Sequence, residues 1–344
     1  MTVGQEVPYS GWQSIIGVEP QLTSTLFVTS TNFLAFNSES MKKEIEEVKL
    51  PHLRNSRDYH RRVMTSENVG GSIEADLDAS SDAVMYLLKS GMGGTVSTAV
   101  VSAAVSFTHT FSPGDMETNG ASAGSALMRA VSIAVRKGST NTFDNSFCRV
   151  NSFTIAAEAG GVATVAFELL GQSQTASLTM GAGAVSFSTV TPVVFDGITI
   201  LTGDSITNIS AEAFTNFEFT VNNNLDDSQR QLGSRNRKQI PVGMREVTLT
   251  LGQRFDTLTS FNRFIQNTAT AIQIKLDSQQ TITGGETTYS MYIDVPQSYF
   301  NSNQVEVGSP DVLMYECNVA AIHDSEQSYV CRLRVTNGTT TYDA

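Results

Sequence analysis

Histidine is the first residue type to examine for chemistry in this sequence of 344 residues. The chain contains four histidines, which are His52, His60, His109 and His323. His52 and His60 share one polar segment, at a spacing that a metal site can use. No acidic or cysteine pattern joins them, so we predict no metal site in this segment.

Cysteine supplies a second set of reactive side chains. The chain has three cysteines, Cys148, Cys317 and Cys331, an odd number at no metal-ligand spacing. Cys317 and Cys331 either meet across neighbouring strands or remain buried free thiols. Free thiols are the usual state of cysteine in a reducing cytosol.

Glycine-rich runs and paired carboxylates complete the search for a catalytic site. The runs Gly91 to Gly94 and Gly181 to Gly183 do not lie between a strand and a helix N-terminus, as a phosphate-binding loop requires. Asp226 and Asp227 form an acidic pair that fits a solvated turn. The GxSxG, P-loop and HExxH motifs are all missing from the sequence. We therefore predict no catalytic residues, no cofactor and no metal, and a protein that is not an enzyme.

Composition excludes several further classes. The 22 basic residues against 34 acidic ones give a net charge of -12, which argues against a protein that grips nucleic acid with its whole surface. Charged residues make up 16% of the chain, against a usual level of about 25%. Ser, Thr, Asn, Gln and Gly supply most of the polar remainder, as in an all-β protein or one covered by neighbours. No apolar run approaches the roughly 20 residues of a membrane helix, and the first ten residues lack the charge pattern of a secretory signal.

The first half of the chain reads as strands interrupted by one basic segment and one helix. Residues 33–48 are strand-like, although 42–47 also fits a charged helix, and residues 49–66 form a basic break. Residues 69–78 then alternate, with Ile73 on the apolar face and acids on the other. A short amphipathic helix follows, capped by Ser80 or Ser81 and stopped by Gly91. Further strands are predicted at 100–111, 126–137, 150–158 and 162–170.

The second half repeats this order. A strand at 214–222 leads into a polar, basic loop, then an alternating strand at 246–251, then a helix with Leu258, Phe261, Phe264 and Ile265 on one face. Later strands are predicted at 272–276, 289–295, 312–322 and 329–335. A repeat of this length indicates a duplicated domain rather than a solenoid. We predict domains at 1–175, with an N-terminal arm, and 176–344, with a linker at about 172–191.

Two stretches carry a family resemblance, residues 36–93 and 147–173. Their motifs are Ser38-Glu39-Ser40, the strand from Gly71 to Leu77, and the hairpin from Val150 to Gly171. The second half adds the strand from Phe217 to Leu225 and the run from Asp294 to Phe300. In this order the motifs resemble the major tail tube proteins of long-tailed bacteriophages, in the form that fuses two tube domains in one chain.

The resemblance implies a mainly β fold with two tandem β-sandwich or β-barrel domains, each with a short flanking helix. Strands of neighbouring subunits close a wide barrel around a lumen, which removes exposed sheet edges. Three two-domain chains complete one ring, a trimeric pseudo-hexamer, and stacked rings form the tube that delivers the genome. The implied partners are other copies of the chain, the tape measure, tail tip and tail terminator proteins, and double-stranded DNA that passes without specific binding. No membrane partner is implied. The implied location is the virion, after assembly in the cytoplasm of the host bacterium.

Charge suggests two sets of functional residues. Three acids on one strand face, Glu74, Asp76 and Asp78, either line the lumen and repel phosphate or lie at the seam between rings. We also predict that two basic loops project along the tube axis onto acidic surface of the next ring. Alternatively, they are solvated loops that become ordered only on assembly. The basic side chains concerned are Arg54, Arg57, Arg61, Arg62, Arg230, Arg235, Arg237 and Lys238.

A second reading is another β-rich phage protein, such as a tail terminator, a decoration protein or an adhesin-like module. The duplicated strand and axial loop favour the tube, because an adhesin has no need of them twice.

Overall fold

The computed structural model describes residues 11–21, 28–52, 58–102, 105–114, 130–138, 141–177, 180, 185–255, 258–303 and 313–342. Strands account for 58% of the chain and helices for 8%, which confirms the predicted mainly β fold. The described strands do not close a barrel within one chain. No helix among the described residues is long and apolar enough to cross a membrane.

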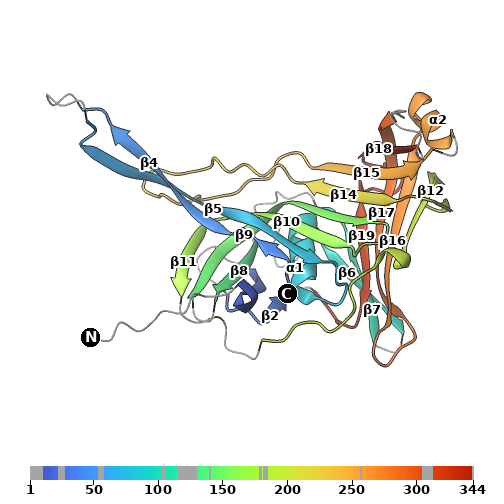
Figure 1. Cartoon of the computed structure of the whole chain (residues 1–344), viewed down its shortest axis with the longest axis horizontal. Helices are drawn as coiled ribbons and strands as arrows, with labels where there is room; N and C mark the ends of the chain where they lie inside the picture. The colour runs from blue at the N-terminus through green and yellow to red at the C-terminus, as the bar shows by residue number, and fades with distance from the viewer. Residues whose placement is uncertain are drawn as a thin grey trace.

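One long antiparallel sheet runs through both halves of the chain (Figure 1). Its strands, in spatial order, are β5 (Arg61–Asp76), β10 (Thr164–Gly171), β9 (Asn141–Glu158), β14 (Asn216–Asn222), β15 (Glu246–Arg254), β18 (Met314–Ala321) and the end of β17 (Thr288–Asn303). The pairing of β9 with β14 joins a strand of the first predicted domain to one of the second. We call this the long sheet.

A second sheet branches from the start of β17. On one side lie β16 (Thr270–Thr281), β12 (Ile198–Ser205) and β13 (Asn208–Glu212). On the other lie β19 (Arg332–Asn337), β7 (Ser106–Phe111) and β6 (Val96–Ser102). The short helix η2 (Phe195–Gly197) leads into β12.

The remaining strands belong to the N-terminal part of the chain. After the short helix η1 (Gly11–Gln13), β1 (Ile15–Gln21) pairs with β2 (Asn32–Leu34) and with β8 (Ala130–Lys137). β8 and β11 (Ser173–Ser177) both pair with the first part of β9. β3 (Ser38–Glu39) and β4 (Lys42–Leu50) pair with β5. The predicted linker at 172–191 therefore begins with a strand, β11.

One hydrophobic cluster fills the space between the sheets and contains residues of both halves, including Ile73, Phe153, Phe219 and Ile293. These side chains point inward because the strands alternate, as the period-2 pattern predicted. The β9–β10 hairpin turns at residues 159–161, also as predicted.

Helix α1 (Asp82–Met92) differs from its predicted form in two ways. It ends at Gly93, which adopts the left-handed φ of 69° and donates to the Lys89 carbonyl, and not at Gly91. Gly91 lies inside the helix, where a Cβ would come within 2.6 Å of Phe153. The helix is also buried on nearly every side rather than on one face, because it is packed between β9 and the strands β1, β2 and β8.

The last described residues pack against this helix. Tyr342 is fully buried; its hydroxyl donates to Asp82 Oδ1 at 2.7 Å and accepts from Asn337 Nδ2 at 2.8 Å. The buried Lys89 ammonium donates to the Tyr342 carbonyl. A C-terminal tyrosine thus completes the core around a helix of the first half.

The order of elements recurs in the second half: β4, loop, β5 and α1 correspond to β14, loop, β15 and α2 (Thr259–Ile265). Residues 42–50 form a strand, not the alternative charged helix.

Candidate assembly surfaces

The outer face of the long sheet is acidic. Its inner face carries buried residues such as Phe167 and Leu249, so the alternate positions face outward. The strand register places these outward positions in rows that cross both halves of the chain, as in the row that joins Glu74, Ala166, Thr154, Thr220, Thr248 and Ala320. We call this surface the acidic face.

Seven carboxylates occupy the acidic face, and the other outward positions between them are Ser, Thr, Asn, Ala and Gly. The carboxylates are Glu74, Asp76, Glu158, Glu168, Glu218, Glu246 and Glu316. None of the rows between Ser72 on β5 and Ala320 on β18 holds a Lys or Arg; Arg149 on β9 lies in the next row beyond Ser72, and Arg254 lies beyond the rows at the end of β15. Charges of one sign on one continuous wall repel polyanions.

The three acids singled out by sequence lie at one edge of this surface. Glu74 is exposed and accepts from Ser38 Oγ at 3.2 Å, and Asp76 accepts from Asn37 Nδ2 at 2.7 Å. Asp78 follows the strand and accepts from the Ser80 amide and hydroxyl at 2.8 Å in the turn before α1. The other five carboxylates were missed, because only the strand pairing brings them beside Glu74.

A hairpin of β4 and β5 projects well beyond the body of the molecule (Figure 1). We call residues 42–69 the arm. Of the predicted basic loop 49–66, Arg61 and Arg62 lie in β5, and Arg54 and Arg57 lie outside the described residues. Arg62 pairs with Glu47 at 2.9 Å. A free two-stranded hairpin is marginal in water, so this arm needs other support.

The second basic loop, predicted at 230–238, lies within the connection 223–245 between β14 and β15, which packs along the base of the arm. Arg230 donates to Asn68, and the Glu67 amide donates to the Arg235 carbonyl at 3.1 Å. Gln172 donates to the Lys238 carbonyl at 3.1 Å. This loop does not simply project, as the sequence suggested; it is fastened to β5 by its own basic residues.

Arg237 is the basic residue of this loop whose position differs most from expectation. It is buried, and its Nη1 donates to the Val69 carbonyl at 2.8 Å and to the Gly171 carbonyl at 3.3 Å. Burial lowers the pKa of this guanidinium, and the charge of Asp227 partly offsets that effect. Arg237 therefore holds the loop on the sheet within its own chain.

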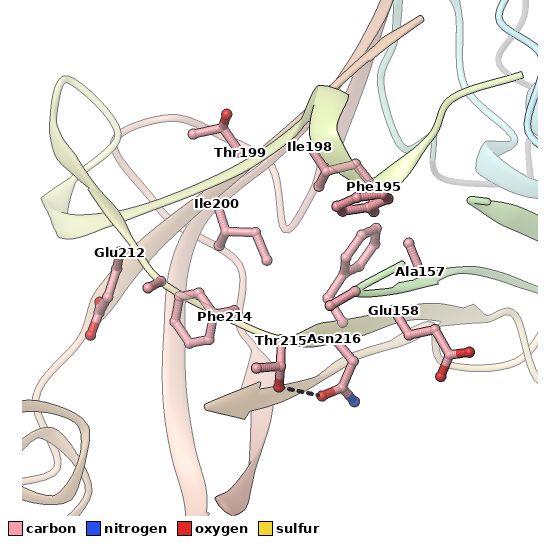
Figure 2. A pocket seen from close by; sticks show the side chains of 13 residues that line it. Ala157, Glu158, Phe195, Ile198, Thr199, Ile200, Glu212, Phe214, Thr215 and Asn216 are labelled. Atoms are coloured by element: carbon pink, nitrogen blue, oxygen red, sulfur yellow. Dashed lines mark hydrogen bonds between the residues drawn. The ribbon is translucent and has the colours of Figure 1, made fainter. Parts of the chain in front are cut away.

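A pocket of about 210 Å³ opens at the end of the long sheet away from the arm (Figure 2). It lies between β9 and β14 on one side and β12 and β13 on the other. Phe195, Ile198, Ile200 and Phe214 supply apolar lining, and its acids are Glu158 and Glu212. The lining contains no basic residue. We call it the end pocket.

Glu212 fastens helix α2 beside this pocket. It accepts from Arg263 Nη1 at 2.9 Å, from Gln253 Nε2 at 3.3 Å and from the Thr202 hydroxyl. The predicted apolar face of α2 is largely exposed instead of packed: Leu258 is 57% and Ile265 62% accessible.

We expect Glu212→Gln to destabilise the subunit by about 1.5 kcal/mol at pH 7, because it weakens charge-assisted hydrogen bonds. Burial raises the pKa of Glu212, but the hydrogen bonds from Thr202 and Arg263 outweigh it, so the pKa lies below the ordinary 4.5. A depressed carboxyl pKa gives stability that is present above pH 4.5 and lost as pH falls through the folded-state pKa. Urea unfolding at pH 7 and pH 3 should therefore show the difference between variant and parent shrinking in acid. Glu286→Gln, at an exposed carboxylate, is the control.

A buried aspartate joins three strands of the second sheet. Asp294 on β17 is fully buried and accepts from Gln273 on β16 at 2.7 Å. Arg332 and Arg334 on β19 each make two hydrogen bonds to it, at 2.7–3.2 Å. The two guanidinium groups also lie over the rings of Tyr329 and Tyr292.

The described residues include the three cysteines and the acidic pair that were considered as sources of chemistry. No group of three or more His, Cys, Asp or Glu side chains there is arranged to hold a metal ion. The three cysteines are buried free thiols, and burial raises the pKa of each to about 12. Asp226 uses its carboxylate in a turn, where hydrogen bonds from Ser228 and Gln229 lower its pKa to about 2.

A comparison with known protein families adds an independent observation. Residues 9–321 match the family described as phage tail tube protein. The chain belongs to this family. A search of curated proteins gave no match. The match covers nearly the whole chain and confirms the resemblance seen in its motifs.

As a tail tube protein, the chain is a structural component of the phage virion. The family implies self-assembly into a tube, with other tail proteins as partners. The acidic face, the arm and the end pocket are therefore candidate surfaces of an assembled tail tube.

Proposed function

We propose that three copies of this chain form a ring and that stacked rings form the tube through which the genome leaves the capsid. Each chain contributes two tandem tube domains, 1–175 and 176–344. The observation that carries this proposal is the acidic face, which continues from β5 to β18 across the β9–β14 pair. A sheet of this width in each of three chains supplies a wall that closes when β5 and its partner strands meet the β17 edge of a neighbour.

The acidic face, in this proposal, lines the lumen. Repulsion between its carboxylates and DNA phosphates keeps the genome from sticking during passage. The absence of Lys and Arg from the rows between Ser72 and Ala320 supports the lumen over the seam between rings, because a seam would gain from paired charges.

The arm, in the same proposal, reaches the next ring along the tube axis. Its position outside the body supports this role, as does the way loop 223–245 fastens its base. Arg61 and Arg62, together with Arg54 and Arg57, would contact acidic surface there. Arg230, Arg235 and Lys238 would lie near the seam and support the arm.

Negative-stain electron microscopy of the purified protein at rising concentration tests the proposal. Hollow tubes or stacked rings, with threefold symmetry of two-domain chains, are the expected result. Discrete closed oligomers without a lumen would contradict it. Addition of a tail tip complex as a nucleus distinguishes slow nucleation from inability to polymerise.

Alanine at Arg54, Arg57, Arg61 and Arg62 should abolish tube formation without unfolding the subunit, because Arg61 and Arg62 are exposed and lie outside the hydrophobic cluster. Microscopy measures the tubes, and urea unfolding measures the fold. Alanine at Lys137 and Lys275, which lie elsewhere on the surface, is the control. Normal tubes from the arm variant would show that these arginines are not needed for stacking.

The remaining partners follow from the same proposal. The tape measure, tail tip and tail terminator proteins would contact the lumen or the two ends of the tube. Assembly would take place in the cytoplasm of the host bacterium.

A further inference from the structure

Exposed apolar side chains lie at both ends of the long sheet, as they do at several other places on the molecule. On the arm, Val48 and Val63 face each other across β4 and β5 and are 46% and 45% accessible. At the other end, Phe195 beside the end pocket is 50% accessible. Apolar surface that is contiguous and exposed is typical of a site of contact with another molecule.

The two ends cannot meet within one chain. The arm continues β5 from the Val69 end of its pairing with β10, whereas the end pocket adjoins the opposite end, where Glu158 pairs with Asn216. Figure 1 shows the same separation, with the arm at the left and β12 at the right. Contact between these surfaces therefore requires a second copy. A contact between two different surfaces of identical chains is head-to-tail, and it builds an open filament unless its rotation closes a ring.

We propose that the end pocket of one subunit seats the Val48–Val63 face of the arm from a copy in the adjoining ring. This inference rests on the proposed function and names the receptor for the arm. Phe195, Ile198 and Phe214 would cover the two valines.

The charges of the two surfaces agree with this docking. Arg61 lies two residues from Val63 on the same face of β5, opposite Leu50. Glu158 and Glu212 line the pocket, Glu158 is exposed, and the lining has no basic residue to oppose the arginine. Docking would place Arg61 beside these acids and would bury the two valine side chains away from water.

Cysteine cross-linking of assembled tubes tests the inference. Because the three native cysteines are buried, cysteines introduced at the surface are the ones that react. The variant Val63→Cys with Phe195→Cys should give a ladder of disulfide-linked chains on a denaturing gel after mild oxidation of tubes. Dispersed subunits of the same variant should stay single. The matched control is Val63→Cys with Thr207→Cys, since Thr207 is an exposed turn residue near β12 that does not line the pocket.

A second measurement uses charge in place of cross-linking. Phe195→Asp should reduce the yield of tubes at least tenfold, whereas Thr207→Asp should assemble as the parent does. The pocket assignment would be overturned if the parent forms tubes and Phe195→Asp assembles normally, or if both cysteine pairs cross-link equally. Either result would leave the proposed tube unaffected. A parent chain that forms no tubes or rings, even with a tail tip complex, would instead overturn the proposed function.

Discussion

Replacing Glu74, Glu168 and Glu218 by lysine should convert the tube from one that does not retain DNA into one that does. The three positions lie on β5, β10 and β14, so the new charges spread over the acidic face. Each change shifts the charge of the chain by two, or six for the triple variant. Cationic side chains that contact phosphates release counterions, and six to ten such contacts make the affinity fall by about 10³ to 10⁵ between 50 and 200 mM salt. Co-sedimentation of labelled linear duplex with tubes at both salt concentrations measures this.

The shape of the DNA shows whether the acidic face lines a lumen. A linear duplex can enter an open tube by its end, but a closed circle cannot. We therefore expect the triple variant to retain linear DNA and not circular DNA. Equal retention of both forms would place the acidic face on the outside. Lysine at Asp204, Glu286 and Glu326, exposed carboxylates outside this face, is the control.

Asp294→Ala should destabilise the subunit by about 3 kcal/mol. Removing one partner of a buried ion pair typically costs about 3–5 kcal/mol, because the remaining charge is left uncompensated. Here the two arginine side chains are 29% and 32% accessible and can partly reach water, so we expect the lower end of that range. Loss of the carboxylate also removes the side-chain hydrogen bonds that join β17 to β16 and β19, although the strands remain paired through their backbones.

Urea unfolding of the dispersed subunit measures this loss. Glu47→Ala is the matched control, because it breaks the exposed pair with Arg62 and should cost about 0.2–1 kcal/mol. Asp294→Asn keeps the volume of the side chain but points an amide group at arginine donors, so it should be nearly as unstable as the alanine variant. A loss below 1 kcal/mol for Asp294→Ala would mean that the arginines find other partners.

Much of the fold could be predicted because most strands have one buried face. Alternation around Ile73 revealed β5, and the same pattern revealed β14 and β15. The outer part of the arm was missed for the opposite reason. Around Arg61 and Arg62 neither face of the hairpin is buried, so no hydrophobic period marks the strand.

The candidate surfaces were less predictable, because they depend on pairing between distant strands. Glu74 was recognised on its own strand, but its neighbour Glu218 is brought close only by the β9–β14 junction. The end pocket likewise combines three separate segments, at 157–159, 195–200 and 212–217. The sequence did not distinguish Arg237 from the other basic residues of the loop. Its hydrogen-bond acceptors are backbone carbonyls, which do not depend on residue type.

The position of Tyr342 has a consequence for synthesis on the ribosome. Proteins usually fold domain by domain as the chain emerges, with the N-terminal part first. Here α1 belongs to the first half, yet its Asp82 and Lys89 find their buried partner in Tyr342, which lies 260 and 253 residues further along the chain. The core of the first half can therefore close only after Tyr342 has left the ribosome. Nascent chains on the same messenger RNA could not yet join a tube. Premature polymerisation would therefore not link the ribosomes of a polysome to one another.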